Sequence, residues 1–366
     1  MKIVLLTSAN GWRGSGVSYA KIARGLLDRG HEVRLVTTVP RLTERLEIEG
    51  LPVTQLPGRD TGPREVWALL RILRQIGAQA IVADTPRDVR LSAYATLLHR
   101  ARIIYRYNLN YRRPRSHLMD RIYLSRVAAC FYQSRYIRRE AYSHAPRLRR
   151  LTSRRIPNGY DTKAFVRDEA AGLAFRKRYG IPSASAVVLT SAKLTRNKGH
   201  DVAIEALDLV RREGIDLVYV VCGDGSREAE LRGLAADQSF PTIFTGLLDS
   251  QEMVAALSAA DVVVHPSLKE IFPNAVGEAM SCACAVIAAD AGGTGELLGS
   301  DGRTGVLVPP GDPPSLADAV QLLLADRGLR QEMGAAARRR IEEEFPLSRM
   351  IDGYESGLAR VVGERG

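Results

Sequence analysis

Two glutamates flank the predicted start of a short helix in the segment 261–290. This segment is expected to fold as a strand at 262–264, a loop at 265–273, a helix at 274–281 and a strand at 285–289. Pro273 suits the helix start because it has no N–H to donate and its φ is already helical. The N–H groups of the first turn then form an anion site. Glu270 precedes the helix and Glu278 lies on it, one turn beyond Asn274. A phosphate could bind at the helix start while these two carboxylates accept hydrogen bonds from the hydroxyl groups of an attached sugar.

A pair of lysines forms the second chemical signal. Lys193 and Lys198 lie in a loop after a predicted strand at 186–191, at the rim where doubly wound folds bind ligands. Two cations so placed can converge on a diphosphate and offset the negative charge of a leaving nucleotide. The competing interpretation is two solvated surface lysines. The chain has 45 Arg and 7 Lys, so two lysines at these positions favour the diphosphate site.

Both motifs resemble those of a known enzyme family. The Glu-x7-Glu spacing, with His265-Pro266-Ser267 before it and Glu278-Ala279-Met280 after it, resembles the donor-sugar motif of retaining nucleotide-sugar glycosyltransferases of family 4. The lysine loop is similar to the family's Arg-Leu-x3-Lys-Gly pattern, with Lys193 where Arg is usual; Lys cannot form a bidentate fork. The resemblance covers essentially the whole chain. It implies an α/β protein with the GT-B fold, two doubly wound Rossmann-like domains facing across a cleft.

The resemblance also implies an activity and a set of site residues. The enzyme would be a retaining, metal-independent glycosyltransferase of hexosyltransferase type, with a nucleoside diphosphate sugar as co-substrate and no cofactor. The catalytic roles would fall to Glu270, Lys198 and Lys193, and Glu278 would hold the nucleotide ribose. The donor-binding residues would be Gly16, Lys193, Lys198, Gly223, Leu247, Glu270, Ile271, Phe272, Pro273, Asn274, Ala275 and Glu278. No Asp-x-Asp pair occurs in the sequence, so a bridging divalent metal is not indicated.

The first half of the chain is expected to bind the acceptor. A strand at 2–7, a glycine loop, a helix at 17–29 and a strand at 33–38 form a βαβ unit. Gly16 in that loop is the expected donor contact, and Trp12 or Arg13 is an acceptor-side candidate. Many relatives carry a histidine after the strand corresponding to 102–107, where this chain has Tyr105-Arg106-Tyr107-Asn108. Arg106 or Asn108 is therefore the candidate for the sugar-facing role.

The chain is long enough for two domains. The segment 154–165 (RRIPNGYDTKAF) is interpreted as a linker, since Pro157 and Asn158-Gly159 break regular structure. Strands and helices alternate on both sides of it. The predicted domains are 1–155 with a C-terminal crossover helix at 346–366, and 156–345, the donor-binding domain.

Charge and composition indicate the partners and the compartment. Residues 1–155 contain 30 Lys and Arg against 11 Asp and Glu, and 16 arginines lie between 99 and 155. Such a surface attracts anions, which could be nucleic acid, an anionic membrane leaflet or an acidic acceptor. The start of the chain has too short an apolar run for a signal peptide, and the four cysteines lie in apolar surroundings, so they are expected to be buried and unpaired. We expect a cytoplasmic protein, with peripheral association at the inner face of the membrane as a hypothesis.

Two other functions compete with sugar transfer. One is a nucleotide-sugar epimerase of GT-B shape, which needs no acceptor. The other is a basic nucleic-acid-binding protein, suggested by the pI of about 9.7. That class needs a groove-reading or base-stacking module, and none is evident, so nucleic acid is not the expected partner. The sequence identifies neither the sugar and base of the donor, nor the acceptor, nor the oligomeric state.

Overall fold

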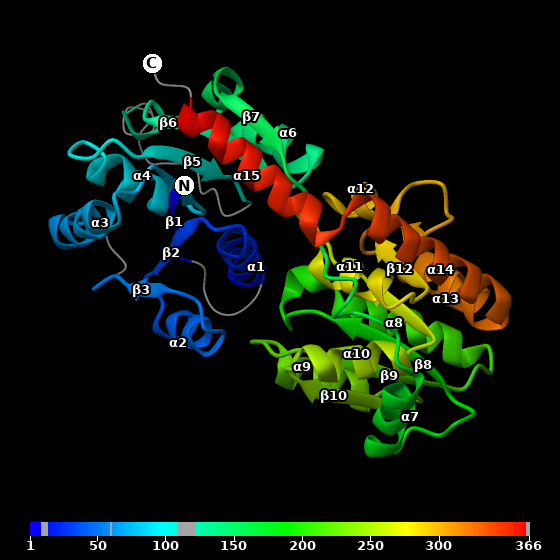
Figure 1. Ribbon diagram of the computed structural model, residues 1–366. Helices are drawn as coiled ribbons and strands as arrows, with labels where there is room; N and C mark the ends of the chain where they lie inside the picture. The colour runs from blue at the N-terminus through cyan, green and yellow to red at the C-terminus, as the bar shows by residue number, and fades with distance from the viewer. Residues whose placement is uncertain (9–13, 59–60, 109–121, 364–366) are drawn as a thin grey trace. The chain divides into compact units, whose positions relative to one another are not determined.

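The protein folds into two compact units. The computed structural model describes residues 1–8, 14–58, 61–108 and 122–363. One unit consists of Met1–Gly159 with Leu347–Gly366, and the other of Tyr160–Pro346 (Figure 1). The sequence places these boundaries at 155/156 and 345/346.

Unit 1 is built on a parallel sheet of seven strands in the order β3-β2-β1-β4-β5-β6-β7. The strands are β1 (Lys2–Thr7), β2 (Glu32–Thr37), β3 (Val53–Gln55), β4 (Ala80–Ala83), β5 (Arg102–Arg106), β6 (Val127–Tyr132) and β7 (Thr152–Arg155). The helices are α1 (Ser15–Asp28), α2 (Pro40–Ile48), α3 (Pro63–Ile76), α4 (Pro86–Ala95), α6 (Arg135–His144), the 3₁₀ helix η1 (Pro146–Arg150) and α15 (Leu347–Gly363). Arg154 and Arg155, expected in a linker, instead form the end of β7, an edge strand whose four residues are all exposed.

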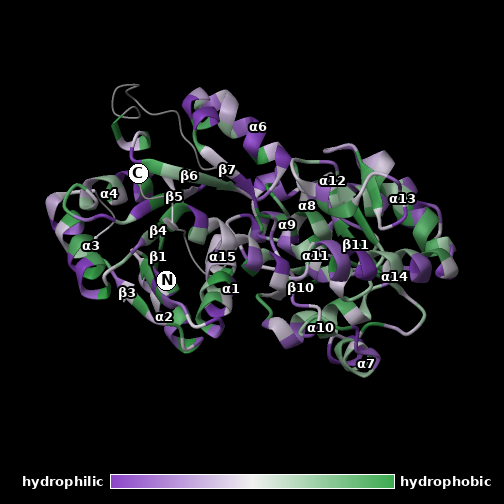
Figure 2. Cartoon of the chain, turned by 45° about the horizontal axis from the view of Figure 1, so that its top comes forward, coloured by the Kyte–Doolittle hydropathy of each residue, from purple (hydrophilic) through white to green (hydrophobic). Residues whose placement is uncertain are grey.

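Both faces of this sheet are buried, as continuous apolar strands predict. Ile3 and Leu5 of β1 pack into a core with α1, α2 and α15, whereas Val4 and Leu6 pack on the opposite face with α3 and α4. Figure 2 shows the hydrophobic colour concentrated on such strands and hydrophilic colour along α6. The sheet is therefore the rigid support for the loops at its carboxyl ends.

The C-terminal helix α15 belongs to unit 1 and packs against α1. Its buried side chains include Ile351 and Tyr354. At the surface, Arg29 pairs with Asp352 and Glu355, each at 2.6 Å, and His31 Nε2 lies 2.8 Å from Glu355. These pairs lower the pKa of Glu355 below its usual range through hydrogen bonds from His31 and Arg29.

Unit 2 contains a second parallel sheet, of six strands in the order β10-β9-β8-β11-β12-β13. The strands are β8 (Ala186–Ser191), β9 (Leu217–Cys222), β10 (Thr242–Gly246), β11 (Val262–His265), β12 (Val286–Ala289) and β13 (Val306–Val308). The helices are α7 (Glu169–Arg178), η2 (Arg196–Lys198), α8 (His200–Arg212), α9 (Glu228–Ala236), α10 (Ser250–Ala259), α11 (Asn274–Ser281), α12 (Thr294–Leu298), α13 (Pro313–Ala325) and α14 (Arg327–Glu344).

The strand order in unit 2 reverses between β8 and β11. From β8 the chain builds outward to β9 and β10, and from β11 it builds in the other direction to β12 and β13. Loops that leave two such strands diverge to opposite faces of the sheet, which opens a crevice beyond their carboxyl ends. The two stretches singled out in the sequence follow these two strands.

The four cysteines are buried and unpaired, which confirms the expectation from their apolar neighbours. Burial raises the pKa of the Cys284 thiol to about 12. Of the helices that the structure describes, none is long and apolar enough to cross a membrane.

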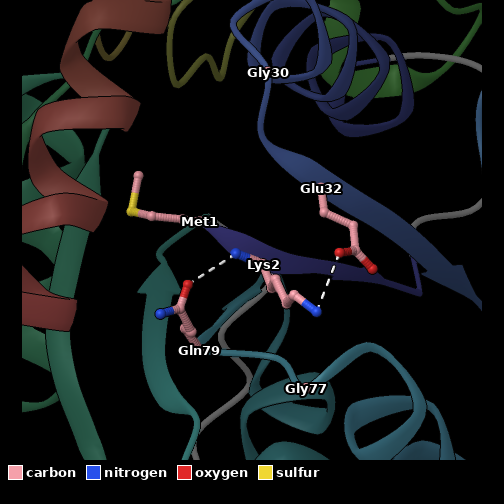
Figure 3. A pocket seen from close by; sticks show the side chains of 6 residues that line it. All are labelled: Met1, Lys2, Gly30, Glu32, Gly77 and Gln79. Atoms are coloured by element: carbon pink, nitrogen blue, oxygen red, sulfur yellow. Dashed lines mark hydrogen bonds and ion pairs between the residues drawn. The ribbon is translucent and has the colours of Figure 1, made fainter.

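A hollow of about 550 Å³ lies at the amino ends of β1, β2 and β4 in unit 1. Figure 3 shows the Lys2 ammonium directed at Glu32, 3.4 Å away, and the Lys2 N–H at Gln79 Oε1, 3.0 Å away. Parallel sheets bind ligands at the carboxyl ends of their strands, so this hollow is at the wrong edge for the predicted chemistry.

Candidate functional site

The loop after β8 and the loop after β11 lie directly against each other. The carbonyl of Asn197 accepts hydrogen bonds from Ser267 Oγ at 3.1 Å and from the Leu268 N–H at 2.9 Å. Gly199 has φ +67°, and a Cβ there would lie 2.1 Å from the Pro266 carbonyl oxygen. A glycine is therefore required on both conformational and steric grounds. This close packing brings the lysine loop to the glutamate loop.

Two side chains, those of Lys198 and His265, contact the same carboxylate oxygen of Glu270. Lys198 Nζ forms an ion pair with Oε1, and His265 Nε2 lies 2.8 Å from it. The Glu270 side chain is largely buried, and burial alone raises its pKa, but the hydrogen bonds and charges of His265 and Lys198 outweigh this and lower the pKa to about 2. Glu270 is therefore a carboxylate at neutral pH.

Lys193 lies at the other end of the same loop and is exposed. Among the described residues no carboxylate lies within ion-pair distance of its ammonium. Its carbonyl accepts a hydrogen bond from His200 Nε2 at 3.2 Å, which fixes the loop to the start of α8. Burial lowers the pKa of His200 to about 4, so this imidazole is neutral and structural.

The start of α11 is uncapped by any side chain, with Pro273 at the N-cap. Tyr160 packs beneath it: its hydroxyl donates to the Pro273 carbonyl at 3.2 Å, and its ring would lie 2.1 Å from a Cβ on Gly277. Burial raises the pKa of Tyr160 well above its ordinary value, and the charges of Glu278 and Glu270 raise it further. Both predicted carboxylates thus lie near one buried tyrosine, on either side of the helix start.

The other predicted donor residues of unit 2 divide by exposure. Phe272 is buried, with its ring 5.5 Å from that of Phe345, so its side chain belongs to the core. Ile271, Asn274 and Ala275 are half-buried. Two further positions follow neighbouring strands: Gly223, whose φ is +148° and where a Cβ would lie 2.1 Å from the Ala192 carbonyl oxygen, and Leu247, which is 62% exposed.

The predicted residues of unit 1 have different surroundings. Gly16 is buried in the first turn of α1, and Trp12 and Arg13 lie outside the described residues. Arg106, expected to face the acceptor, is 3% exposed; its guanidinium donates to Asp84 Oδ1 at 2.9 Å and to the Tyr354 hydroxyl at 3.0 Å. Asn108, the other candidate for the sugar-facing role, is buried and donates to the Asp84 carbonyl at 2.9 Å. Both residues are therefore part of an internal hydrogen-bond network, which reaches α15 through Tyr354. The Asp84 carboxylate compensates the buried guanidinium of Arg106, whose burial without a partner would be costly.

Three residues of the site were not assigned a role from the sequence. His265 and Ser267 were used there as motif context, and their hydrogen bonds to the neighbouring loop are visible in coordinates alone. Tyr160 lay in the predicted linker, where an aromatic residue between Gly159 and Asp161 was the available signal. Within the described ranges, no three His, Cys, Asp or Glu side chains gather as a metal site would require.

Two family models match the chain, one in each half. A model described as Glycosyl transferases group 1 matches residues 173–340, and a model described as Glycosyltransferase Family 4 matches residues 12–164. Together these matches span most of both units, and the first includes the lysine loop, the glutamate loop and α11.

Curated relatives are about one third identical to the chain over the aligned residues. An alpha-D-kanosaminyltransferase of Streptomyces kanamyceticus is 30% identical over 62% of this chain and 58% of its own length. A D-inositol 3-phosphate glycosyltransferase of Pseudarthrobacter chlorophenolicus is 32% identical over 57% of this chain and 51% of its own length. A GDP-mannose-dependent monoacylated alpha-(1-6)-phosphatidylinositol monomannoside mannosyltransferase of Corynebacterium glutamicum is 32% identical over 53% and 52%. The chain thus spans little more than half the length of these relatives.

Solved structures match the fold over nearly the whole chain. A glycosyltransferase from Rickettsia africae superimposes with a TM-score of 0.87 at 18% identity, covering 100% of this chain and 99% of that one. The Anabaena protein HepE in complex with UDP-glucose gives 0.86 at 20% identity, covering 98% and 100%. At these identities the likeness concerns the fold, which is GT-B with two Rossmann-like domains.

Proposed function

Since the chain belongs to the glycosyltransferases of family 4, we propose that it transfers a sugar from a nucleoside diphosphate sugar to a glycan or lipid-linked acceptor, with retention of the anomeric configuration. The observation that supports this most directly is the convergence of Lys198 and Glu270 at the strand-order reversal of unit 2. Cations and helix N–H groups bind a diphosphate, and a carboxylate accepts hydrogen bonds from sugar hydroxyls. Both are available within two adjacent loops.

The proposed reaction assigns each group a part. Lys193, Lys198 and the N–H groups at the start of α11 bind the diphosphate and stabilise the charge that grows on it as its bond to the anomeric carbon breaks. The acceptor oxygen bonds to that carbon on the same face, and its proton passes to the departing diphosphate. Glu270 accepts hydrogen bonds from the sugar, and Glu278 from the ribose. We assign no residue as nucleophile and no step to a metal ion.

The named relatives support the class of donor and acceptor. One is named for GDP-mannose and a phosphatidylinositol mannoside, another for D-inositol 3-phosphate, and HepE was solved with UDP-glucose. Both acceptors carry phosphate. An anionic acceptor also suits the charge of unit 1, where exposed arginines gather on α6, η1 and β7: Arg135, Arg139, Arg147, Arg149, Arg150, Arg154 and Arg155.

These arginines also support the hypothesis of peripheral docking on an anionic leaflet. Each Lys or Arg near such a surface contributes about 1 kcal/mol of attraction. Flotation with vesicles of phosphatidylcholine alone, and with phosphatidylserine added, tests this. We expect recovery with the anionic vesicles alone and its loss in high salt; equal recovery with both vesicle types contradicts the hypothesis.

A thermal-shift panel tests the proposed donor. UDP, GDP and ADP, each alone and as the glucose or mannose conjugate, are added to the intact protein, since a ligand of the folded form raises the unfolding temperature. We expect one base to stabilise the protein and its sugar conjugate to be hydrolysed slowly or transferred. If no nucleotide or conjugate stabilises the protein at millimolar concentration, the proposed function is wrong.

The same samples separate the alternatives. An epimerase converts its nucleotide sugar without an acceptor and without steady release of nucleoside diphosphate, so release of diphosphate argues for transfer. The curated relatives reported above are transferases, which also favours transfer. A basic nucleic-acid-binding protein would retard random duplex DNA at near-physiological salt; we expect no retardation.

A further inference from the structure

The contacts of Glu270 distribute unequally over its two carboxylate oxygens. Lys198 Nζ and His265 Nε2 both contact Oε1. In the part of the chain that the structure describes, Oε2 has no hydrogen-bond partner. A carboxylate accepts hydrogen bonds and donates none, so in the contact between His265 and Glu270 the proton is on His265 Nε2. This arrangement holds one oxygen of Glu270 and leaves the second for a ligand.

The two partners of Oε1 differ in how firmly they are held. His265 is the last residue of β11, a buried strand inside the sheet, and its side chain is 5% exposed. Lys198 ends the single turn η2, and its ammonium stands on a flexible four-carbon chain. Under the proposed function Lys198 turns to the diphosphate when a donor binds. His265 is then the partner that stays on Glu270.

A second imidazole, that of His200, is close enough for the charge of His265 to affect its pKa, but it does not hold Glu270. Its Nε2 is engaged by the Lys193 carbonyl, and its Nδ1 is buried without a partner among the described residues. The start of α11 carries no side-chain cap that reaches Glu270 either. The orientation of Glu270 after Lys198 has turned therefore depends on His265.

We propose that His265 is the positioning residue of Glu270: through Nε2 it fixes Oε1, so that Oε2 accepts hydrogen bonds from the donor sugar whether or not Lys198 is on the diphosphate. This inference rests on the proposed function and adds a residue to it. It predicts that His265 matters for the sugar and not for the nucleoside diphosphate.

Binding measurements on the intact protein test this split. Dissociation constants are measured by calorimetry for UDP and UDP-glucose, or for GDP and GDP-mannose, whichever pair stabilises the wild type in the panel above. The variants are His265→Phe, which removes the donor, and His265→Gln, whose amide nitrogen reaches a similar position. A lost hydrogen bond to a charged group corresponds to a roughly tenfold to hundredfold weaker complex.

We expect His265→Phe to weaken the sugar conjugate at least about tenfold and the free diphosphate less than about twofold, and His265→Gln to restore most of the loss. Glu270→Gln should show the same split, and adding His265→Phe to it should cause little further loss. If His265→Phe leaves both dissociation constants unchanged, or raises both by the same factor, the positioning role is wrong and the proposed function still holds. A wild type that binds neither ligand overturns both.

Discussion

Replacement of Arg106 by Met is expected to destabilise unit 1 strongly, because it leaves a charge without its partner. Arg106 Nη1 lies 2.9 Å from Oδ1 of Asp84, whose side chain is fully buried. Thr7 Oγ1 also donates to this carboxylate, at 3.3 Å. Methionine fills much of the space of the arginine stem but donates nothing, so the buried Asp84 carboxylate loses its cationic partner.

Breaking a buried ion pair from one side costs about 3–5 kcal/mol. For a unit of this size, each kcal/mol lowers the unfolding temperature by about 2–4 °C, so we expect a fall of roughly 6–20 °C. Asp84→Asn in the Arg106→Met background removes the stranded charge, and part of the loss should return. Arg100→Met, just before the same strand and exposed, is the matched control and should stay within about 0.5 kcal/mol of the wild type.

Tryptophan emission gives a readout of unit 1, because both tryptophans, Trp12 and Trp67, lie in the first 159 residues. Urea titrations followed by emission and by far-ultraviolet dichroism give the midpoints, and nucleotide binding checks that unit 2 stays folded. If Arg106→Met unfolds with the wild-type midpoint, the buried-pair reasoning is wrong. A fall in turnover with unchanged stability would return Arg106 to the acceptor-facing role that the sequence suggests.

Three further changes have expected outcomes. Lys198→Ala should lower turnover on the order of 10²-fold or more in a donor-hydrolysis or transfer assay, with exposed Lys177→Ala near wild type. Burial lowers the pKa of His200 to about 4 from 6.5, so protonation of this group favours the unfolded chain. Its own contribution to stability should fall by about 2 kcal/mol from pH 7 to pH 5, and the difference between wild type and His200→Gln in urea titrations at the two pH values measures it. Gly277→Ala should destabilise unit 2 by about 1–3 kcal/mol or more, whereas Gly233→Ala, with open space around it, should be neutral or stabilising.

The repeated strand and helix pattern was predictable where the apolar runs are long. The strands Lys2–Thr7 and Ala186–Ser191 and the helix Asn274–Ser281 have the bounds expected from the sequence. Shorter or more polar elements were not assigned, among them β3, α6 and α7, and the apolar six-residue strand β6 was missed as well. Exposed β7 shows the reason: a strand with four polar residues at a sheet edge has no hydrophobic period to reveal it.

The proximity of Lys198 and Glu270 followed from their places after two strands, but their direct ion pair did not. It depends on which strands are neighbours, and the reversal of strand order between β8 and β11 is a property of the whole sheet. The predicted ligand-facing role of Arg106 also depended on a neighbouring strand that the sequence does not identify. An arginine at a strand end looks ligand-facing in sequence, and the carboxylate that engages it, Asp84, comes from the neighbouring strand's loop.

The arginines at the end of β7 have a consequence for self-association. An outermost strand offers unpaired N–H and C=O groups on which another chain can add a strand, and cationic side chains are one way in which proteins prevent such addition. Arg154 and Arg155 stand on that strand, so two copies meeting edge to edge would place like charges opposite each other. Replacing both with Thr should therefore lower the solubility of the folded protein.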